Sequence, residues 1–205
     1  MSGFSAMIGN PPWERPRVED KEWWSMYPSI ANAKKSTRVK RINDLKKEDP
    51  LLVEEYEKDI QKYNLLKTYL SGGSFPLTGH GTLNLYGLFA EIMVTLSKNI
   101  GLITQTNLVT DVMTHRWFKE LILSKRISNI TDFVNKKPFF QNVAANTRFS
   151  IVTVKESSPT LSITANNTSI DEALSKSAYI VNSEIVQKIN GDAFTCPMFT
   201  SKTEL

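Results

Sequence analysis

The chain has 205 residues, which fits one domain with a sizeable core, and its 40% apolar and 22% charged residues are typical of a globular protein. One cysteine, Cys196, excludes an intrachain disulfide framework, and no apolar run approaches the roughly 20 residues of a membrane span. A net charge of +4 permits nucleic-acid binding without establishing it.

A stiff segment rich in hydrogen-bond acceptors follows the first apolar run. Residues 4–8 (FSAMI) predict a short buried strand, and residues 9–13 (GNPPW) predict the loop after it. The two prolines fix φ and lack an N–H, and Pro11 keeps Asn10 out of the helical region. The Asn10 amide and the Pro11 carbonyl are then two acceptors beside the flat ring of Trp13. This pattern suits a planar ring with an exocyclic amine; the alternative is a Pro-rich turn with a half-buried tryptophan.

Residues 14–50 are polar and irregular, and they predict a long loop inserted in the domain. Loops of this length in compact domains are usually functional or disordered. A basic stretch lies within it, which is either a phosphate-contacting surface or a solvated charged face. The candidate phosphate contacts are Lys34, Lys35, Arg38, Lys40 and Arg41.

The rest of the chain alternates helical and extended patterns. Apolar periodicity predicts helices over 51–70, 83–97 and 112–123, and strands over 101–106, 127–134 and 148–154. Residues 155–182 are rich in Ser, Thr and Asn and predict a linker or surface loop, with room for a short helix near 171–177. This order is typical of half of a doubly wound α/β sheet.

Residues 8–13 (IGNPPW) resemble the catalytic motif of the S-adenosylmethionine-dependent amino-methyltransferases, chiefly the DNA adenine-N6 methyltransferases. The resemblance implies that the Asn10 side chain and the Pro11 carbonyl bind the amine of a flipped-out adenine. It also implies that Pro12 completes the catalytic loop and that Trp13 stacks on the base.

Two further segments resemble motifs of this family in the same order. Residues 84–89 (NLYGLF) are similar to its helix motif, which implies partial cofactor contacts by Asn84, Tyr86 and Phe89. Residues 101–103 (GLI) and 110–111 (TD) resemble the next strand and helix start in the large type IIG restriction–modification and phage-exclusion enzymes.

A late motif completes the resemblance. Residues 137–143 (KPFFQNV) are similar to the segment whose aromatic residue packs on the opposite face of the base. That role falls by position on Phe140, with Phe139 as the fallback. Both phenylalanines would otherwise be ordinary core residues. Cys196 has no Cys or His partners nearby, so we expect no metal site and read it as a small apolar filler.

One departure from the family pattern matters as much as these matches. The Gly-rich turn that binds the cofactor precedes the catalytic motif in such enzymes, and no Phe-x-Gly-x-Gly occurs in this chain. We therefore expect residues 1–155 to form a partial catalytic domain, the C-terminal half of a Rossmann-like S-adenosylmethionine-dependent methyltransferase sheet. Residues 156–205 are expected to link it to a missing target-recognition domain. The missing cofactor-binding half would be in cis or a separate chain.

The resemblance implies site-specific methylation of adenine N6 in double-stranded DNA, with S-adenosylmethionine as cofactor, by a restriction–modification enzyme of the bacterial or archaeal cytoplasm. The isolated chain is expected to be inactive. One alternative keeps the chemistry but acts on RNA or on a protein glutamine. The other is a non-catalytic truncated chain that serves as an interaction half.

Overall fold

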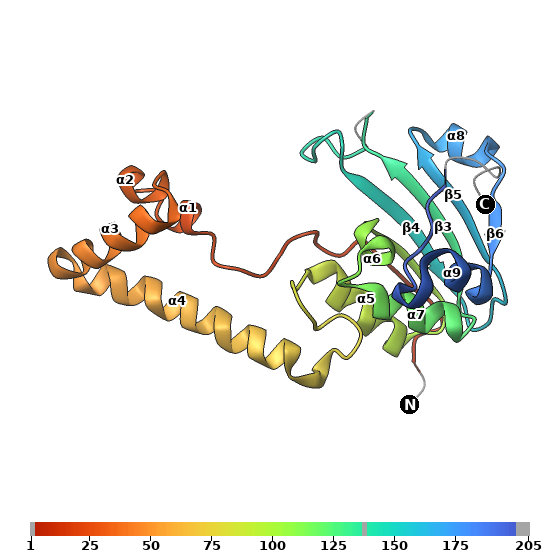
Figure 1. The fold of residues 1–205 in the computed structure, drawn as a ribbon, viewed down its shortest axis with the longest axis horizontal. Helices are drawn as coiled ribbons and strands as arrows, with labels where there is room; N and C mark the ends of the chain where they lie inside the picture. The colour runs from red at the N-terminus through yellow and green to blue at the C-terminus, as the bar shows by residue number, and fades with distance from the viewer. Residues whose placement is uncertain (1–2, 137–138, 200–205) are drawn as a thin grey trace. The chain divides into compact units, whose positions relative to one another are not determined.

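The computed structural model describes residues 3–136 and 139–199, which divide into two compact units. One unit comprises residues 1–15 and 75–205 and contains the β-sheet. The other, residues 16–74, is helical (Figure 1). None of the helices in the described residues is long and apolar enough to cross a membrane.

Six strands form a single mixed sheet. Their spatial order is β1-β2-β4-β3-β5-β6, and Figure 1 labels the last four of them, β4, β3, β5 and β6. The pairs β1–β2 and β3–β5 are parallel, and the other three are antiparallel. The strands are β1 (Met7–Gly9), β2 (Ile100–Gln105), β3 (Ile127–Val134), β4 (Arg148–Val154), β5 (Leu161–Asn167) and β6 (Tyr179–Val181). The predicted α/β class and the three longer predicted strands are confirmed.

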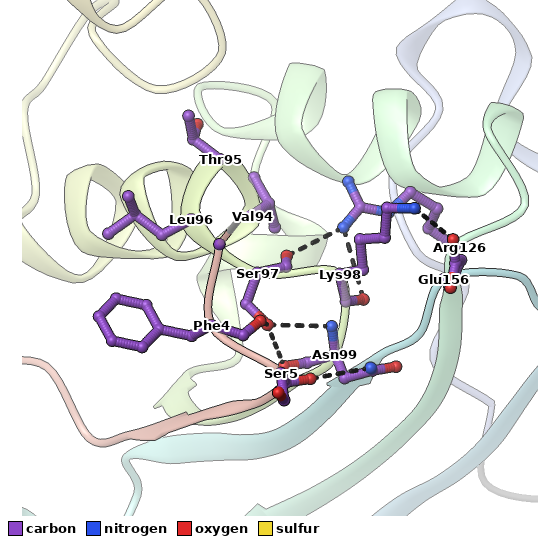
Figure 2. A pocket seen from close by; sticks show the side chains of 11 residues that line it. Phe4, Ser5, Val94, Thr95, Leu96, Ser97, Lys98, Asn99, Arg126 and Glu156 are labelled. Carbon is purple, nitrogen blue, oxygen red and sulfur yellow. Dashed lines mark hydrogen bonds and ion pairs between the residues drawn. The ribbon is translucent and has the colours of Figure 1, made fainter. Parts of the chain in front are cut away.

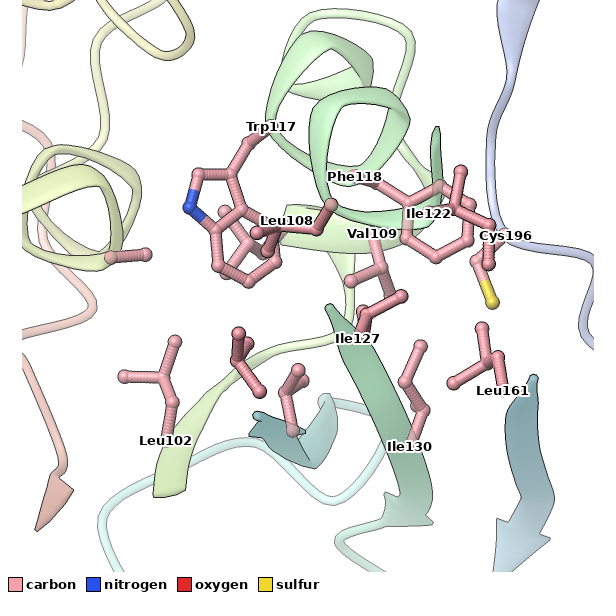
Figure 3. Close-up of a cluster of buried hydrophobic side chains, with 14 of the residues drawn as sticks. Leu102, Leu108, Val109, Trp117, Phe118, Ile122, Ile127, Ile130, Leu161 and Cys196 are labelled. Carbon is pink, nitrogen blue, oxygen red and sulfur yellow. The ribbon is translucent and has the colours of Figure 1, made fainter. Parts of the chain in front are cut away.

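Helices bury one face of this sheet. Trp117 and Phe118 are fully buried and face Leu102, Ile127 and Ile130 of the strands (Figure 3). Burial of each large apolar side chain contributes about 1.5–3 kcal/mol. The helices of this unit are α5 (Leu85–Leu96), α6 (Asn107–Thr110), α7 (His115–Leu123), α8 (Ile170–Ser175) and α9 (Ser183–Asn190).

The opposite face of the sheet is open near β1. Ile8 is 91% exposed, and Ile151 shares its face by register and is 39% exposed. Parallel sheets in doubly wound folds are covered on both faces. The described residues therefore cover this part of the sheet on one side only. Cys196 lies in the covered core, as expected for an apolar filler, and burial raises the pKa of its thiol.

The predicted loop over residues 14–50 is wrong, because most of this segment is helical. It contains α1 (Asp20–Trp23), α2 (Pro28–Ala31) and α3 (Lys35–Glu48), followed by α4 (Pro50–Tyr69), which confirms the predicted helix over 51–70. These helices form because their apolar side chains pack into a small hydrophobic core within this unit. Trp24 and Val53 are fully buried there, with Trp23 and Tyr56 packed against them.

The predicted linker beyond residue 155 is also wrong, because β5, α8, β6 and α9 complete the sheet unit. The polar composition of β5 was misleading because a partner on the neighbouring strand β3 bonds to a buried polar side chain of β5. The Asn167 amide, for example, donates to the Asp132 carbonyl at 2.8 Å. The short helix expected near 171–177 is confirmed as α8, whose first turn is capped by the Ser169 hydroxyl. Residues 200–205 lie outside the described part.

Candidate functional site

Two loops meet at the carboxyl ends of parallel strands. Residues 10–13 leave the end of β1, and the loop over residues 135–147 leaves the end of β3. Ligands of α/β sheets bind in crevices at this edge. The two loops enclose a cavity of about 450 Å³, whose lining is Asn10, Pro11, Pro12, Trp13, Glu14, Phe140, Asn142 and Val143. The structure thus brings the predicted catalytic loop and the predicted stacking residue Phe140 together.

Two aromatic rings line one side of this cavity, and a third packs against both of them. The Trp13 indole and the Phe140 ring meet edge-on, with centroids 5.1 Å apart and planes at 73°. Phe149 supports both, stacked on Trp13 at 6.0 Å and edge-on to Phe140 at 5.1 Å. Phe139, the fallback, packs on Phe133 and Phe149 and does not line the cavity. Lys137 and Pro138 of the same motif lie outside the described residues.

The acceptor groups of the loop are free. Asn10 is exposed, and its side-chain amide makes no hydrogen bond within the described residues. The carbonyl of buried Pro11 likewise accepts none from that part of the chain. The buried indole Nε1 of Trp13 also lacks a partner there. Asn10 and Pro11 therefore keep two acceptors unpaired within the described residues, on the loop that carries Trp13, and their role toward an amine stays a prediction.

The predicted cofactor residues lie at the start of α5 and do not line this cavity. Asn84 accepts a hydrogen bond from Arg15 Nε at 3.2 Å and donates to the Thr82 carbonyl at 3.1 Å. Tyr86 is buried, which raises its pKa to about 12, and Phe89 is 44% exposed. Asn84, Tyr86 and Phe89 therefore lie outside the cavity between the two loops, and their contact with a cofactor stays a prediction.

A larger cavity, of about 620 Å³, lies at the opposite edge, near the amino ends of the parallel strands (Figure 2). Its polar groups are bonded to one another. The Ser97 hydroxyl donates to the Phe4 carbonyl at 3.0 Å, Asn99 Nδ2 donates to Ser5 at 3.0 Å, and Arg126 donates to the Ser97 carbonyl at 3.2 Å. These bonds tie the start of the chain to β2, so this cavity has a structural explanation.

The five predicted phosphate contacts lie in the helical unit and divide into two groups. The Arg38 guanidinium pairs with Asp20 at 2.8 Å and donates to the carbonyls of Ile30, Ala31 and Ala33. Arg41 donates to the Ser29 carbonyl. Both arginines therefore have structural partners, and the role expected for Arg38 is replaced by helix docking. The remaining three are exposed lysines at the start of α3 or within it: Lys34, Lys35 and Lys40.

Two buried polar residues next to the site escaped prediction. Asp132 pairs with Arg148 at 2.5 Å and accepts from the Thr106 hydroxyl at 2.6 Å. Asn135, at the base of the loop that carries Phe140, is fully buried. The sequence did offer a signal for Asp132, because it is a polar residue within the apolar pattern of 127–134. No local signal marks Asn135. Within the described residues, no cluster of three or more His, Cys, Asp or Glu side chains could hold a metal ion.

The comparisons with known proteins concern the fold. No family model and no curated protein matches the sequence. A chain from a structure of type I restriction–modification complex assembly aligns at a TM-score of 0.51 and 10% identity, over 98% of this chain and 39% of that chain. The type I methyltransferase subunit from Streptococcus thermophilus aligns at 0.50 and 10% identity, over 95% and 38%.

This chain thus spans about two fifths of the length of each of these neighbours. Sequence identity this low carries a conclusion about the fold alone. The mixed α/β sheet with its covering helices resembles part of the fold of these chains, and the methyltransferase-like sheet expected from the sequence is confirmed at that level.

Proposed function

We propose that this chain is the acceptor-binding part of a DNA adenine-N6 methyltransferase of a restriction–modification system, acting in the bacterial or archaeal cytoplasm. One observation carries the proposal. The free acceptors of Asn10 and Pro11 and the rings of Trp13 and Phe140 line one cavity of about 450 Å³. This volume lies in the range of small-molecule sites.

The chemistry follows from the two acceptors. When the Asn10 oxygen and the Pro11 carbonyl take both hydrogens of an exocyclic amine, the nitrogen lone pair is left to point away from them. Trp13 holds the ring in plane, and Pro12 keeps the loop stiff. The contribution of the chain is orientation and hydrogen bonding of the nucleophile, and no covalent enzyme intermediate is required. The proton of the methylated amine then leaves to water.

S-adenosylmethionine is the methyl donor that we propose for the complete enzyme. No Phe-x-Gly-x-Gly turn occurs in this chain, so the role that we propose for it is to hold the acceptor. Asn84, Tyr86 and Phe89 would then contact the donor only when a cofactor-binding half, in cis or as a separate chain, packs beside α5. A recognition domain, also supplied elsewhere, would choose the DNA site.

Double-stranded DNA is the substrate we favour over RNA or a protein glutamine. The fold neighbours are chains of type I restriction–modification systems. The exposed side chains of Lys34, Lys35 and Lys40 make no hydrogen bond or ion pair within the described residues and are free to contact phosphates. A base in a duplex must be flipped out to reach a pocket of this kind.

The proposal is tested by nucleotide binding to the chain, followed by NMR. Titration with dAMP should perturb the Trp13 indole signal, and dIMP should bind at least about tenfold more weakly, because its carbonyl replaces the amine and faces two acceptors. Asn10→Ala should abolish the preference for dAMP. Asn142→Ala, which removes the same side chain from the same cavity, should keep it.

Equal binding of dAMP and dIMP would contradict an amine site. The reaction itself is tested with the complete gene product, by nucleoside analysis of DNA incubated with labelled S-adenosylmethionine. Label in N6-methyladenine, lost in Asn10→Ala, supports the proposal. Label in a methylated cytosine, in RNA or in protein would assign the site to another acceptor.

A further inference from the structure

We infer that Asn135 is a positioning residue that fixes Phe140 against Trp13. The identity of the ligand in this cavity rests on the proposed function. The positioning role of Asn135 rests on hydrogen bonds within the chain. Asn135 directly follows β3 and is fully buried, whereas most of the described residues of the loop after it are exposed. A buried amide at the base of an exposed loop needs partners, because a buried polar group without a hydrogen bond destabilises the folded state.

Those partners are the backbone groups of the loop itself. Asn135 Nδ2 donates to the Phe140 carbonyl at 3.1 Å and to the Val143 carbonyl at 2.9 Å. Its Oδ1 accepts from the Phe140 N–H at 3.3 Å. The amide therefore holds the N–H and the carbonyl of the same residue, Phe140, which fixes both the position and the direction of its backbone.

The same loop is closed by backbone bonds around this side chain. The Asn135 N–H donates to the Thr147 carbonyl at 3.0 Å, and the Val143 N–H donates to the Phe140 carbonyl at 3.2 Å. Phe140 and Val143 both line the cavity. Asn135 thus fixes the backbone of two cavity-lining residues, although its own side chain does not line the cavity.

The pattern of bonds requires an amide. Two carbonyls need donors and one N–H needs an acceptor, which the Asn side chain supplies from one planar group. Aspartate offers only acceptors and would face two carbonyl oxygens. Alanine would leave all three groups without this partner. A loop fixed before the ligand arrives does not have to be ordered on binding, which favours affinity.

The experiment uses 5-fluorotryptophan in the whole chain and fluorine NMR, with the Trp13 signal assigned through Trp13→Phe. Asn135→Ala and Asn135→Asp should shift or broaden the Trp13 signal while those of Trp23, Trp24 and Trp117 stay in place. Both Asn135 variants should bind dAMP about tenfold more weakly than the wild-type chain does. The matched control is Asn129→Ala, which removes a β3 asparagine side chain whose one partner in the described residues is the Thr131 hydroxyl, a donor to its Oδ1 at 3.0 Å.

A Trp13 signal that is unchanged in both Asn135 variants would overturn the inference. If wild type fails to bind dAMP but the Trp13 signal still responds to Asn135, the proposed function fails and the positioning role stands. If wild type binds dAMP and the variants bind it equally well, the positioning role fails alone.

Hydrogen exchange of the wild-type chain covers the case in which the variants do not fold. The Phe140 amide should exchange at least about tenfold more slowly than those of Gln141 and Asn142, because Asn135 Oδ1 accepts its hydrogen bond. Exchange as fast as that of these neighbours would overturn the inference without any variant.

Discussion

The ring of Phe140 meets the Trp13 indole edge-on at 5.1 Å, with an interplanar angle of 73°. The two residues come from loops at the ends of different strands, and Phe149 contacts both. A base stacked between two parallel rings needs them about 7 Å apart, twice the contact distance of carbon atoms. The pair is closer and tilted, so a base would either stack on Trp13 alone, with Phe140 at its edge, or displace the Phe140 ring.

Truncation of Phe140 tests whether this ring contacts the base. Phe140→Ala should weaken dAMP binding by about 1–3 kcal/mol, the contribution of an aromatic side chain stacked on a base. Phe139→Ala is the matched control, because Phe139 lies next to it but outside the cavity. It should leave binding within twofold. Isothermal titration of both variants decides the assignment, and a greater loss in Phe139→Ala would transfer the role to the fallback residue.

Removal of the Asn10 side chain should separate function from stability. Asn10 is exposed and its amide has no hydrogen-bond partner in the described residues, so Asn10→Ala should change the free energy of unfolding by less than about 0.5 kcal/mol. Nucleotide binding should nevertheless fall at least about tenfold. Urea denaturation and titration on the same sample measure both. A large loss of stability would mean that Asn10 is a structural residue.

The features that the sequence predicted correctly depend on local physical chemistry. The proline pair fixes the backbone of residues 10–12 whatever surrounds it. The strands over 127–134 and 148–154 follow from β-branched residues in alternation. Their helical neighbour α7 follows from apolar residues at helical spacing. In each case the information lies within a few residues.

The features that were missed depend on long-range partners. Helix α3 has no fully buried residue, and only Ile42 and Leu45 of it pack against the helical core, so its apolar pattern is weak. It also docks through polar contacts such as that of Arg38 with Asp20. Strand β5 accommodates the buried polar side chain of Asn167 because a group on another strand, the Asp132 carbonyl, accepts from its amide at 2.8 Å. Asn135 could not be recognised, because a single asparagine in a sequence does not show which carbonyls it will meet.

S-adenosylmethionine should not bind the isolated chain with low-micromolar affinity. Phe89 is 44% exposed, and the Asn84 amide is already engaged by Arg15 and the Thr82 carbonyl. Binding would lack an enclosed apolar surface for the adenine ring of the cofactor. Calorimetric titration checks this directly, with Phe89→Ala as the control for any weak binding at α5. A dissociation constant of a few micromolar would contradict the expected division of the active site.

The basic residues of α3 should fall into structural and binding groups. Arg38→Gln removes a largely buried guanidinium that holds Asp20 and three carbonyls, so the helical unit should lose roughly 2–4 kcal/mol. Changing Lys34, Lys35 and Lys40 together to Gln should leave stability unchanged. It should reduce the salt dependence of duplex DNA binding by up to about 2.7 in the slope of log K against log salt.

Fluorescence anisotropy of a labelled duplex across a salt series measures this slope. The control replaces three lysines of α4 in the same unit, Lys58, Lys62 and Lys67, and so removes the same charge from another helix. If this control lowers the slope as much as the α3 variant does, the effect is one of net charge and the phosphate-contact assignment fails.

The buried tyrosine of α5 should make the sheet unit sensitive to alkali. Burial raises the pKa of Tyr86 to about 12, whereas an unfolded tyrosine titrates near 10. Below pH 10 both states keep the proton and stability is constant. Between pH 10 and 12 the unfolded state loses it first, so the free energy of unfolding should fall by about 1.4 kcal/mol per pH unit from this group.

Tyr86→Phe should remove that part of the slope and leave stability at pH 7 within about 1 kcal/mol, because the hydroxyl makes no hydrogen bond within the described residues. The urea midpoint, followed through the fluorine signal of Trp117 from pH 7 to 11.5, measures the difference. Identical slopes in the two proteins would mean that Tyr86 ionises as easily in the folded chain as in the unfolded one.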